Sequence, residues 1–301
     1  MREYGILSGR ACLVTGATSG IGAVTATELA NLGATIIVHG RDEARCKGAV
    51  AAIRAGDRHP LVEYIVADFA SLESVRAMAE ELHHRFDRLD ILVNNAGAMY
   101  PDRRESADGH ELTFAVNHLA PFLLTNLLLD MLRAGAPARV VNVASGAHRR
   151  AALDLDDLES RKSYEPREVY ARTKLMNVLF NRELARRLEG SGVTANALSP
   201  GIVHTEFGVK DGMGADQQAV MDKGKSPQEG ARTSIYLASA PELADSNGGY
   251  YQDCAPLELG ANATDDETAQ WLWQVSAKLV GLQETVGGPS QRGRKSAPPG
   301  P

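Results

Sequence analysis

Two side chains near the middle of the chain have the types and spacing needed for proton transfer. Tyr170 and Lys174 stand four residues apart in a segment of helical periodicity that runs to about Glu189, so they lie a turn apart on one face. An ammonium group close to a phenol favours the phenolate and lowers a tyrosine pKa that starts at about 10. The pair therefore predicts general acid/base chemistry. Tyr164 lacks such a neighbour, because Glu168 follows it four residues on.

Two further polar residues extend this candidate group. Ser145 follows a run of β-branched residues, at the carboxyl edge where open α/β sheets bind ligands, and its hydroxyl can polarise a substrate oxygen. Asn117 lies in an otherwise apolar helical segment, where an amide is costly to bury without a partner. Each residue alone has an ordinary structural explanation. The combination of Asn117, Ser145, Tyr170 and Lys174 predicts a catalytic site.

A glycine-rich turn near the N-terminus has the context of a dinucleotide-binding loop. Residues 15–22 read Thr-Gly-Ala-Thr-Ser-Gly-Ile-Gly and stand between the first predicted strand and the first predicted helix. Gly16 permits a tight turn, Gly20 lets backbone amides approach a pyrophosphate, and Gly22 lets the helix pack closely on the strand. The alternative is a glycine-rich turn without a ligand, because the spacing is G-x-x-x-G-x-G instead of G-x-G-x-x-G.

The end of the second predicted strand bears on the choice of dinucleotide. Gly40 stands where enzymes that prefer NAD tend to place an acidic residue for the ribose 2′-hydroxyl. Arg41 follows, and its guanidinium can pair bidentately with a 2′-phosphate, helped by Arg45 or Ser19. We therefore expect NADP(H) to be preferred over NAD(H). The alternative is a surface arginine paired with one of the two acidic residues that follow it.

These residues need a scaffold that brings distant segments together. From residue 10 to about 200, short apolar runs alternate with segments of helical periodicity, which predicts βαβ units and a parallel sheet. No strand reads as half exposed. We expect a single-domain, Rossmann-type doubly wound α/β fold of about seven strands in three αβα layers. The predicted strands are Ala11 to Thr15, Thr35 to His39, Val62 to Ala67, Ile91 to Asn94, Arg139 to Ala144, Val193 to Leu198 and a last one at Gly249 to Tyr251.

Loops and tail follow from composition. Residues 146–166 and 208–226 are polar and predict long loops after strand ends, which usually carry specificity. We expect the acidic run from Asp154 to Glu159 to be solvated surface. Residues 208–226 and residues 264–282, the latter with Trp271 and Trp273, predict an apolar lid. The NADP-binding domain spans residues 1–282, and residues 283–301 predict a disordered tail.

The overall composition excludes several classes of protein. Hydrophobic residues make up 44% and charged residues 23%, as in globular proteins, and the net charge of -6 argues against nucleic acid as a partner. The three cysteines, Cys12, Cys46 and Cys254, have no metal-ligand spacing, so we expect no metal and a reducing, cytoplasmic location. No apolar stretch reaches the ~20 residues of a spanning helix, and we expect no membrane anchor.

In this order, these residues resemble the short-chain dehydrogenase/reductase family over residues 8 to 255. Asn94-Asn95-Ala96-Gly97 after the fourth strand and Pro200-Gly201 after the sixth are further hallmarks of the family. The resemblance implies that Tyr170 is the acid/base, that Lys174 binds the nicotinamide ribose and lowers the tyrosine pKa, that Ser145 holds the substrate oxygen, and that Asn117 orders a proton-relay water.

The resemblance also implies the cofactor contacts. Asp68 would meet the adenine, Asn95 and Gly97 would line the adenosine side, and Thr205 would help to seat the carboxamide. The full implied set is Gly16, Thr18, Ser19, Gly20, Ile21, Gly22, Arg41, Asp68, Asn95, Gly97, Tyr170, Lys174, Pro200, Gly201, Val203 and Thr205.

Residues 39–42, 117–122 and 145–148 resemble the retinol dehydrogenase and protochlorophyllide reductase-like branch, which generally prefers NADP. Two departures are expected. We expect no hydrophobic N-terminal anchor like that of microsomal retinol dehydrogenases, and Ala144 replaces a serine often found at its position. We expect a small, apolar aldehyde, ketone or alcohol as substrate.

Other assignments stay open. Extended relatives that act as sugar-nucleotide epimerases or dehydratases share Tyr-x-x-x-Lys, but they tend to use G-x-x-G-x-x-G and a larger C-terminal domain. A non-catalytic NADP-binding regulator is the second alternative. Leucine-rich helical faces within residues 109–134 and 168–189 are compatible with a homodimer or homotetramer, but they could equally pack on the sheet.

Overall fold

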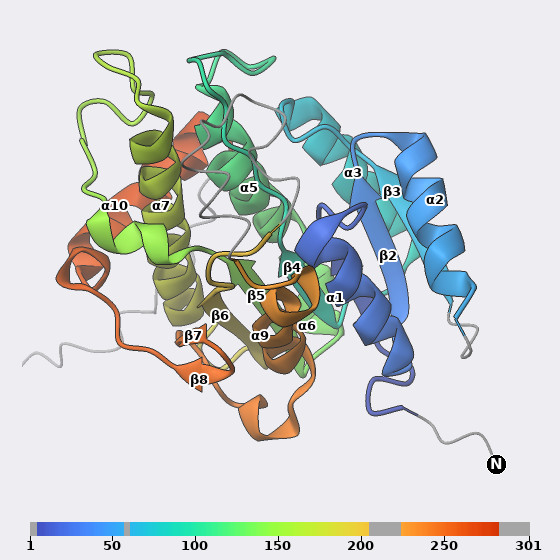
Figure 1. Ribbon diagram of the computed structural model, residues 1–301. Coiled ribbons are helices and arrows are strands. Elements are labelled where there is room, and N and C mark those ends of the chain that lie inside the picture. Colours follow the sequence, from blue (N-terminus) through green and yellow to red (C-terminus); the bar gives the residue numbers. More distant parts are fainter. Residues whose placement is uncertain (1–4, 57–60, 205–223, 283–301) are drawn as a thin grey trace, which may run out of the picture.

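The strands of this chain form one sheet with helices on both faces (Figure 1). The computed structural model describes residues 5–56, 61–204 and 224–282, and in these ranges eight strands pair in the order β3-β2-β1-β4-β5-β6-β7-β8. Neighbouring strands are parallel except β7 and β8, which are antiparallel. The strand order reverses between β1 and β4, as in doubly wound folds. The predicted Rossmann-type, three-layer α/β fold is confirmed.

The predicted strands are present, with ends that differ by no more than one residue. The strands are β1 (Ala11–Val14), β2 (Thr35–Gly40), β3 (Val62–Val66), β4 (Ile91–Asn94), β5 (Ala138–Val143), β6 (Val193–Ser199), β7 (Tyr250–Gln252) and β8 (Ala255–Pro256). Strand β8 is additional, because Asp253 and Cys254 adopt positive φ angles of 53° and 61° and turn the chain back. An Asp-Cys pair lacks the glycine that usually signals such a hairpin.

Strand β3 corrects the expectation that no strand is half exposed. Val62 and Ile65 are buried, whereas Glu63 and Val66 are exposed. Because β3 is the edge strand of the sheet, the helices cover it only in part.

The helices follow the strands as the periodicity predicts. They are α1 (Gly20–Asn31), α2 (Glu43–Arg54), α3 (Leu72–Arg85), α4 (Leu112–Phe114), the π-helical turn η1 (Ala115–Leu119), α5 (Ala120–Leu127), α6 (Leu129–Ala134), the 3₁₀ turn η2 (Gly146–Arg150), α7 (Pro166–Arg187), α9 (Pro227–Ser239), the 3₁₀ turns η4 (Pro241–Leu243) and η5 (Ala261–Ala263), and α10 (Asp266–Leu279). Gly33 and Gly190 have φ angles of 98° and 72° after α1 and α7, the left-handed conformation in which helices commonly end.

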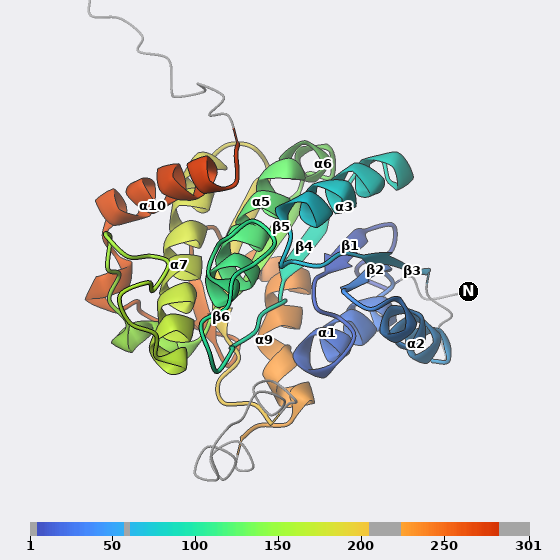
Figure 2. The ribbon, with the colours of Figure 1, turned by 90° about the horizontal axis from the view of Figure 1, so that it is seen from above.

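Alternate side chains of the central strands enter two separate cores. Leu13 of β1 faces a core shared with α3, α5, α7 and α10, whereas Cys12 and Val14 face a second core shared with α1, α2 and α9. This alternation follows from the two-residue period of a strand. Figure 2 shows the two helical layers on opposite sides of the strands.

Helix α10 is part of the first core and is not a lid. Trp273 is 7% exposed, and its ring centroid lies 4.9 Å from that of Phe122 on α5 and 5.7 Å from that of Phe180 on α7. In Figure 2, α10 lies beside α5 and α7. The faces considered for contact between subunits are therefore covered in part by the same chain. The predicted C-terminal tail and most of residues 208–226 lie outside the described residues.

Candidate active site

The glycine-rich turn after β1 packs so closely on its neighbours that two of its positions have no room for a side chain. Gly16 has a φ angle of 63°, and a Cβ atom there would lie 2.9 Å from Ala96 Cα. A Cβ atom at Gly22 would lie 2.3 Å from Gly16 O and 2.4 Å from Asn95 Nδ2. Both positions therefore require glycine for close approach of backbone to backbone.

The N-terminus of α1 fits an anionic group. Ser19 precedes the helix, is exposed, and makes no side-chain capping bond, and the first turn contains no acidic residue. The first amides of a helix have no partner within it, and the helix dipole favours negative charge at this end. The residues present therefore suit the pyrophosphate of a dinucleotide.

Two side chains attach this turn to its neighbours. Asn95 Nδ2 donates to the Thr15 carbonyl at 2.8 Å, so Asn95 supports the turn from the end of β4. His39 at the end of β2 accepts from the Gly16 amide at Nδ1 and donates from Nε2 to the Ala67 carbonyl. Burial lowers the His39 pKa to about 4 and keeps the ring neutral. The sequence offered no signal for the role of His39, because its partners come from other segments.

The end of β2 leaves no room for an acidic side chain at position 40. A Cβ atom at Gly40 would lie 2.5 Å from Thr18 Cγ2 and 2.9 Å from Cys46 Sγ. The space that an acidic side chain would need there is thus already filled by Thr18.

Arg41, which follows, is exposed. Its acidic neighbours have other partners, since Asp42 accepts from the Arg45 amide and Glu43 pairs with Lys47 at 2.9 Å. Among the described residues Arg41 makes no ion pair, so the alternative of a neutralised surface arginine loses its support.

The four predicted catalytic side chains gather at the carboxyl ends of β4 and β5. Lys174 is buried on α7, its Nζ donates to the Val143 carbonyl at 3.0 Å, and it lies 5.5 Å from the Tyr170 ring centroid. A Cβ atom at Gly97 would lie 3.5 Å from Lys174 Nζ and 3.3 Å from Asn117 Oδ1. Segments far apart in sequence therefore meet around Gly97.

Burial shifts the pKa values of the pair in opposite directions. Desolvation raises the pKa of Tyr170 to about 12, although a hydrogen bond with Ser145 and the charge of Arg150 lower it in part. Desolvation lowers the pKa of Lys174 to about 8. The predicted direction for Tyr170 is therefore wrong, because removal of the phenol from water outweighs the nearby charges.

Asn117 lies in the π-helical turn between α4 and α5. Its Oδ1 accepts from the Ala98 amide at 2.7 Å, and its Nδ2 donates to the Ala98 carbonyl at 2.8 Å. A third bond, at 3.1 Å, runs from Nδ2 to Thr173 Oγ1. The buried amide thus has the partners that its burial requires, and π-helical turns often mark functional sites.

Ser145 stands two residues after β5, at the start of η2. Its Oγ accepts from the Ala147 amide at 3.2 Å and forms the hydrogen bond with Tyr170. The buried His148 ring donates from Nδ1 to the Ser145 carbonyl at 2.7 Å. The serine hydroxyl and the phenol therefore face one another across the start of η2.

The remaining implied cofactor residues are more scattered. Asp68 is exposed, and its carboxylate accepts from the Ala70 amide at 3.0 Å. After Pro200, Gly201 has a φ angle of 81°. Val203 is buried near Ile21, since both approach the Cβ position of Gly230. Thr205 lies outside the described residues.

Two features are absent from the part of the chain that the structure describes. It contains no helix with the length and hydropathy needed to cross a bilayer. Nor do its His, Cys, Asp and Glu side chains form a group of three or more that could hold a metal ion.

Known proteins resemble this chain over nearly its whole length. The family model described as short chain dehydrogenase matches residues 10–214. Retinol dehydrogenase 14 of Homo sapiens is 44% identical, covering 93% of this chain and 89% of its own length. Retinol dehydrogenase 13 of Homo sapiens is 43% identical, with 92% and 86% covered.

Solved structures agree with the sequence relatives. An uncharacterized protein from Mycobacterium paratuberculosis has a TM-score of 0.73 at 33% identity, covering 91% of this chain and 94% of its own. The RhlG/NADP active-site complex from Pseudomonas aeruginosa has a TM-score of 0.67 at 27% identity, with 88% and 99% covered. Fold, motifs and relatives agree, and the chain therefore belongs to the short-chain dehydrogenase/reductase family of carbonyl and alcohol oxidoreductases, in its retinol dehydrogenase-like branch.

Proposed function

We propose that this chain is an NADP-dependent oxidoreductase that interconverts a carbonyl group and an alcohol, with Tyr170 as general acid/base. The observation that carries the proposal is the convergence of the Tyr170 phenol, the Ser145 hydroxyl and the Lys174 ammonium at the carboxyl ends of β4 and β5. Ligands bind at this edge in open α/β sheets.

The three side chains divide the work of proton transfer. A bound nicotinamide supplies or accepts the hydride. Ser145 donates a hydrogen bond to the substrate oxygen and, with Tyr170, polarises it. Because the pKa of Tyr170 is raised to about 12, its phenol is protonated at neutral pH and ready to donate a proton to a carbonyl oxygen that gains negative charge. Lys174, with a pKa of about 8, is largely charged there and favours the phenolate that this donation leaves.

Asn117 supplies a route for replacing that proton. Its backbone carbonyl has no amide hydrogen four residues along the chain, because residue 121 is proline. We propose that this carbonyl holds a water molecule through which Lys174 exchanges protons with solvent. The Asn117 side chain, bound to Ala98 on both sides, keeps the carbonyl in place.

The preference for NADP(H) rests on the end of β2. Thr18 fills the space that an acidic side chain at position 40 would need, and beside it the exposed Arg41 makes no ion pair with any described residue. A guanidinium pairs bidentately with phosphate, so the 2′-phosphate of NADP(H) is the group that suits this corner. Ser19, exposed and without a capping bond, is a second donor within the same turn.

The substrate is proposed to be small and apolar, carrying an aldehyde, a ketone or an alcohol. Relatives named retinol dehydrogenases support a hydrophobic alcohol or aldehyde. We also propose a reducing, cytoplasmic location, which the free and buried thiols of Cys12 and Cys46 support.

A panel of aldehydes, ketones and secondary alcohols, assayed with NADPH, NADH and their oxidised forms, tests this function. We expect turnover with NADPH or NADP to exceed that with NADH or NAD. Tight NADPH binding without turnover of any substrate would instead favour a non-catalytic regulator. Equal rates with the two reduced cofactors would contradict the NADP preference alone.

A further inference from the structure

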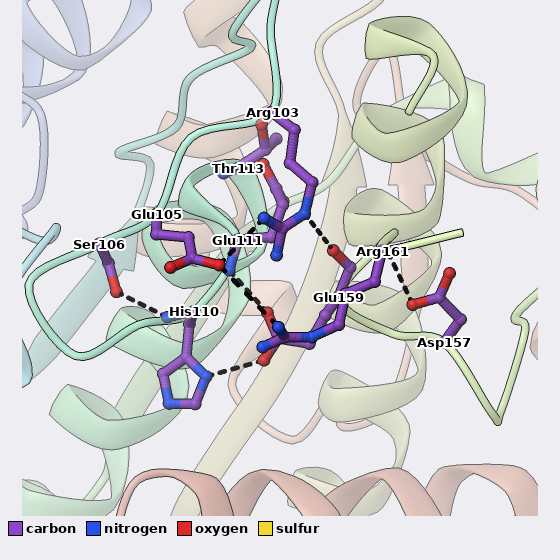
Figure 3. Close-up of polar contacts among 9 residues, drawn as sticks. All are labelled: Arg103, Glu105, Ser106, His110, Glu111, Thr113, Asp157, Glu159 and Arg161. Atoms are coloured by element: carbon purple, nitrogen blue, oxygen red, sulfur yellow. Dashed lines mark hydrogen bonds and ion pairs between the residues drawn. The ribbon is translucent and has the colours of Figure 1, made fainter. Parts of the chain in front are cut away.

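Two loops that leave the same edge of the sheet are joined by a cluster of polar contacts (Figure 3). One follows β4 and ends at α4, and the other follows η2 and ends at α7. Glu159 of the second loop reaches both residues at the end of the first. Its Oε1 lies 2.8 Å from His110 Nδ1, and its Oε2 accepts from the Glu111 amide at 2.6 Å. The side chain is only 17% exposed, so the expectation of solvated surface is wrong for Glu159.

The His110 ring adds a third element to this junction. Besides Glu159, it forms a hydrogen bond with the backbone of Leu279 at the end of α10. The hydrogen bond with Glu159 raises the His110 pKa above its ordinary value. The Glu159 carboxylate therefore binds the His110 ring through one oxygen and the Glu111 amide through the other, which holds it in one orientation.

Glu111 transmits this restraint into the helix that follows. Its carboxylate is fully buried and accepts from the Thr113 amide at 2.8 Å and the Phe114 amide at 2.7 Å, which caps α4. Its backbone amide is the one bound by Glu159. A residue held at both its backbone and its side chain fixes where α4 begins.

The line of contacts continues to the candidate active site. Helix α4 is only three residues long and runs directly into the π-helical turn that contains Asn117. Asn117 in turn holds Ala98 through its amide, next to Gly97 and Lys174. If the start of α4 shifts, Asn117 therefore shifts with it, because only a few residues separate the two and could compensate for the movement.

We propose that Glu159 is a positioning residue of the candidate active site, which acts by holding the Glu111 amide and thereby the turn that bears Asn117. The kinetic consequence of this inference rests on the proposed function, whereas its structural consequence does not. Glu159 lies outside every motif that identifies the family, and its role is visible only through contacts between loops that are 48 residues apart.

Glu159→Ala tests the proposal in the full chain, with Glu105→Gln as the matched control. Glu105 belongs to the same cluster, pairing with Arg103 at 3.0 Å and Arg161 at 4.0 Å, but its carboxylate does not hold Glu111. Hydrogen exchange at the Ala98 amide reports the bond to Asn117 without any cofactor or substrate. We expect Glu159→Ala to speed this exchange about tenfold and to lower kcat by a similar factor, with NADPH affinity unchanged. Glu105→Gln should leave all three as in the wild type.

The outcomes separate this inference from the proposed function. Wild-type exchange at Ala98 and wild-type kcat in Glu159→Ala would overturn the positioning role. If the wild-type chain turns over no substrate, the proposed function fails while the exchange measurement still decides this inference. If Glu159→Ala does not fold, Glu159→Gln replaces it. Its amide oxygen accepts more weakly than a carboxylate, so exchange at Ala98 should still exceed the wild-type rate, and equal rates would contradict the proposal.

Discussion

Tyr170 and Lys174 share a buried environment that favours the neutral form of each. The pKa of the phenol rises to about 12 and that of the ammonium falls to about 8, so a charge on either group depends on what else lies beside it. In the structure as it stands, a hydrogen bond with Ser145 and the charge of Arg150 lower the Tyr170 pKa in part. The four-residue spacing of Tyr170 and Lys174 predicted that these two side chains lie close together. It could not predict their desolvation, because desolvation depends on packing from several elements.

Arg41→Ala tests the cofactor preference at a single residue. Loss of hydrogen bonds to a charged phosphate costs about 1.5–3 kcal/mol, so kcat/KM for NADPH should fall ten- to a hundredfold, while that for NADH should stay nearly constant. Lys47→Ala is the control, because Lys47 is a cation of the neighbouring helix that already pairs with Glu43. An equal loss with both cofactors would show that Arg41 does not distinguish them.

At the scale of elements, close approaches between backbone segments decide where the site residues stand. The turn after β1 rests against the end of β4, and the π-helical turn at Asn117 rests against Ala98. The apolar runs predicted the strands well, because strands buried on both faces have few alternatives. They could not predict β8, because a strand of two residues is too short to show a pattern. They could not predict the packing of α10 either, because an apolar helix face does not show which element it packs against.

Gly22→Ala tests the requirement for a close approach. The new Cβ atom would stand 2.3 Å from the Gly16 carbonyl, so the turn must move away from the helix. We expect at least a tenfold loss of NADPH affinity and a lower melting temperature, both measurable on the purified chain. Gly48→Ala is the matched control, because a Cβ atom there meets nothing within 4 Å beyond its chain neighbours and the backbone of its own helix, and alanine favours a helix by up to about 1 kcal/mol. If Gly22→Ala and Gly48→Ala had similar NADPH affinities and melting temperatures, the close approach at Gly22 would not be required.

Across the whole molecule, buried histidines connect layers that are distant in sequence. His39 joins β2, the glycine-rich turn and the end of β3, whereas His118 lies among Phe114, Phe122 and Phe180 and bonds Ser276 of α10. Both roles depend on partners from distant segments, so the sequence alone could not show them.

These histidines predict how stability depends on pH. Burial lowers the pKa of His39 and His118 from 6.5 to about 4, so the unfolded chain binds these protons more readily than the folded one. The contribution of the two neutral histidines to the free energy of unfolding is complete above pH 6.5. It is lost as pH falls toward 4, by about 1.4 kcal/mol per pH unit for each group. His118→Gln should therefore flatten the decrease in the free energy of unfolding between pH 6.5 and 4.5. An unchanged slope in denaturant titrations would contradict the neutral, buried state of His118.

The most direct measurement of the central claim is the rate of NADPH-dependent carbonyl reduction by Tyr170→Phe compared with the wild type. Phenylalanine keeps the ring and removes the proton donor, whose contribution to general acid catalysis is typically 10²- to 10⁴-fold. We expect kcat to fall by about that factor while the dissociation constant for NADPH remains as in the wild type. A variant that retains most of the wild-type rate would contradict the assignment of Tyr170 as the acid/base.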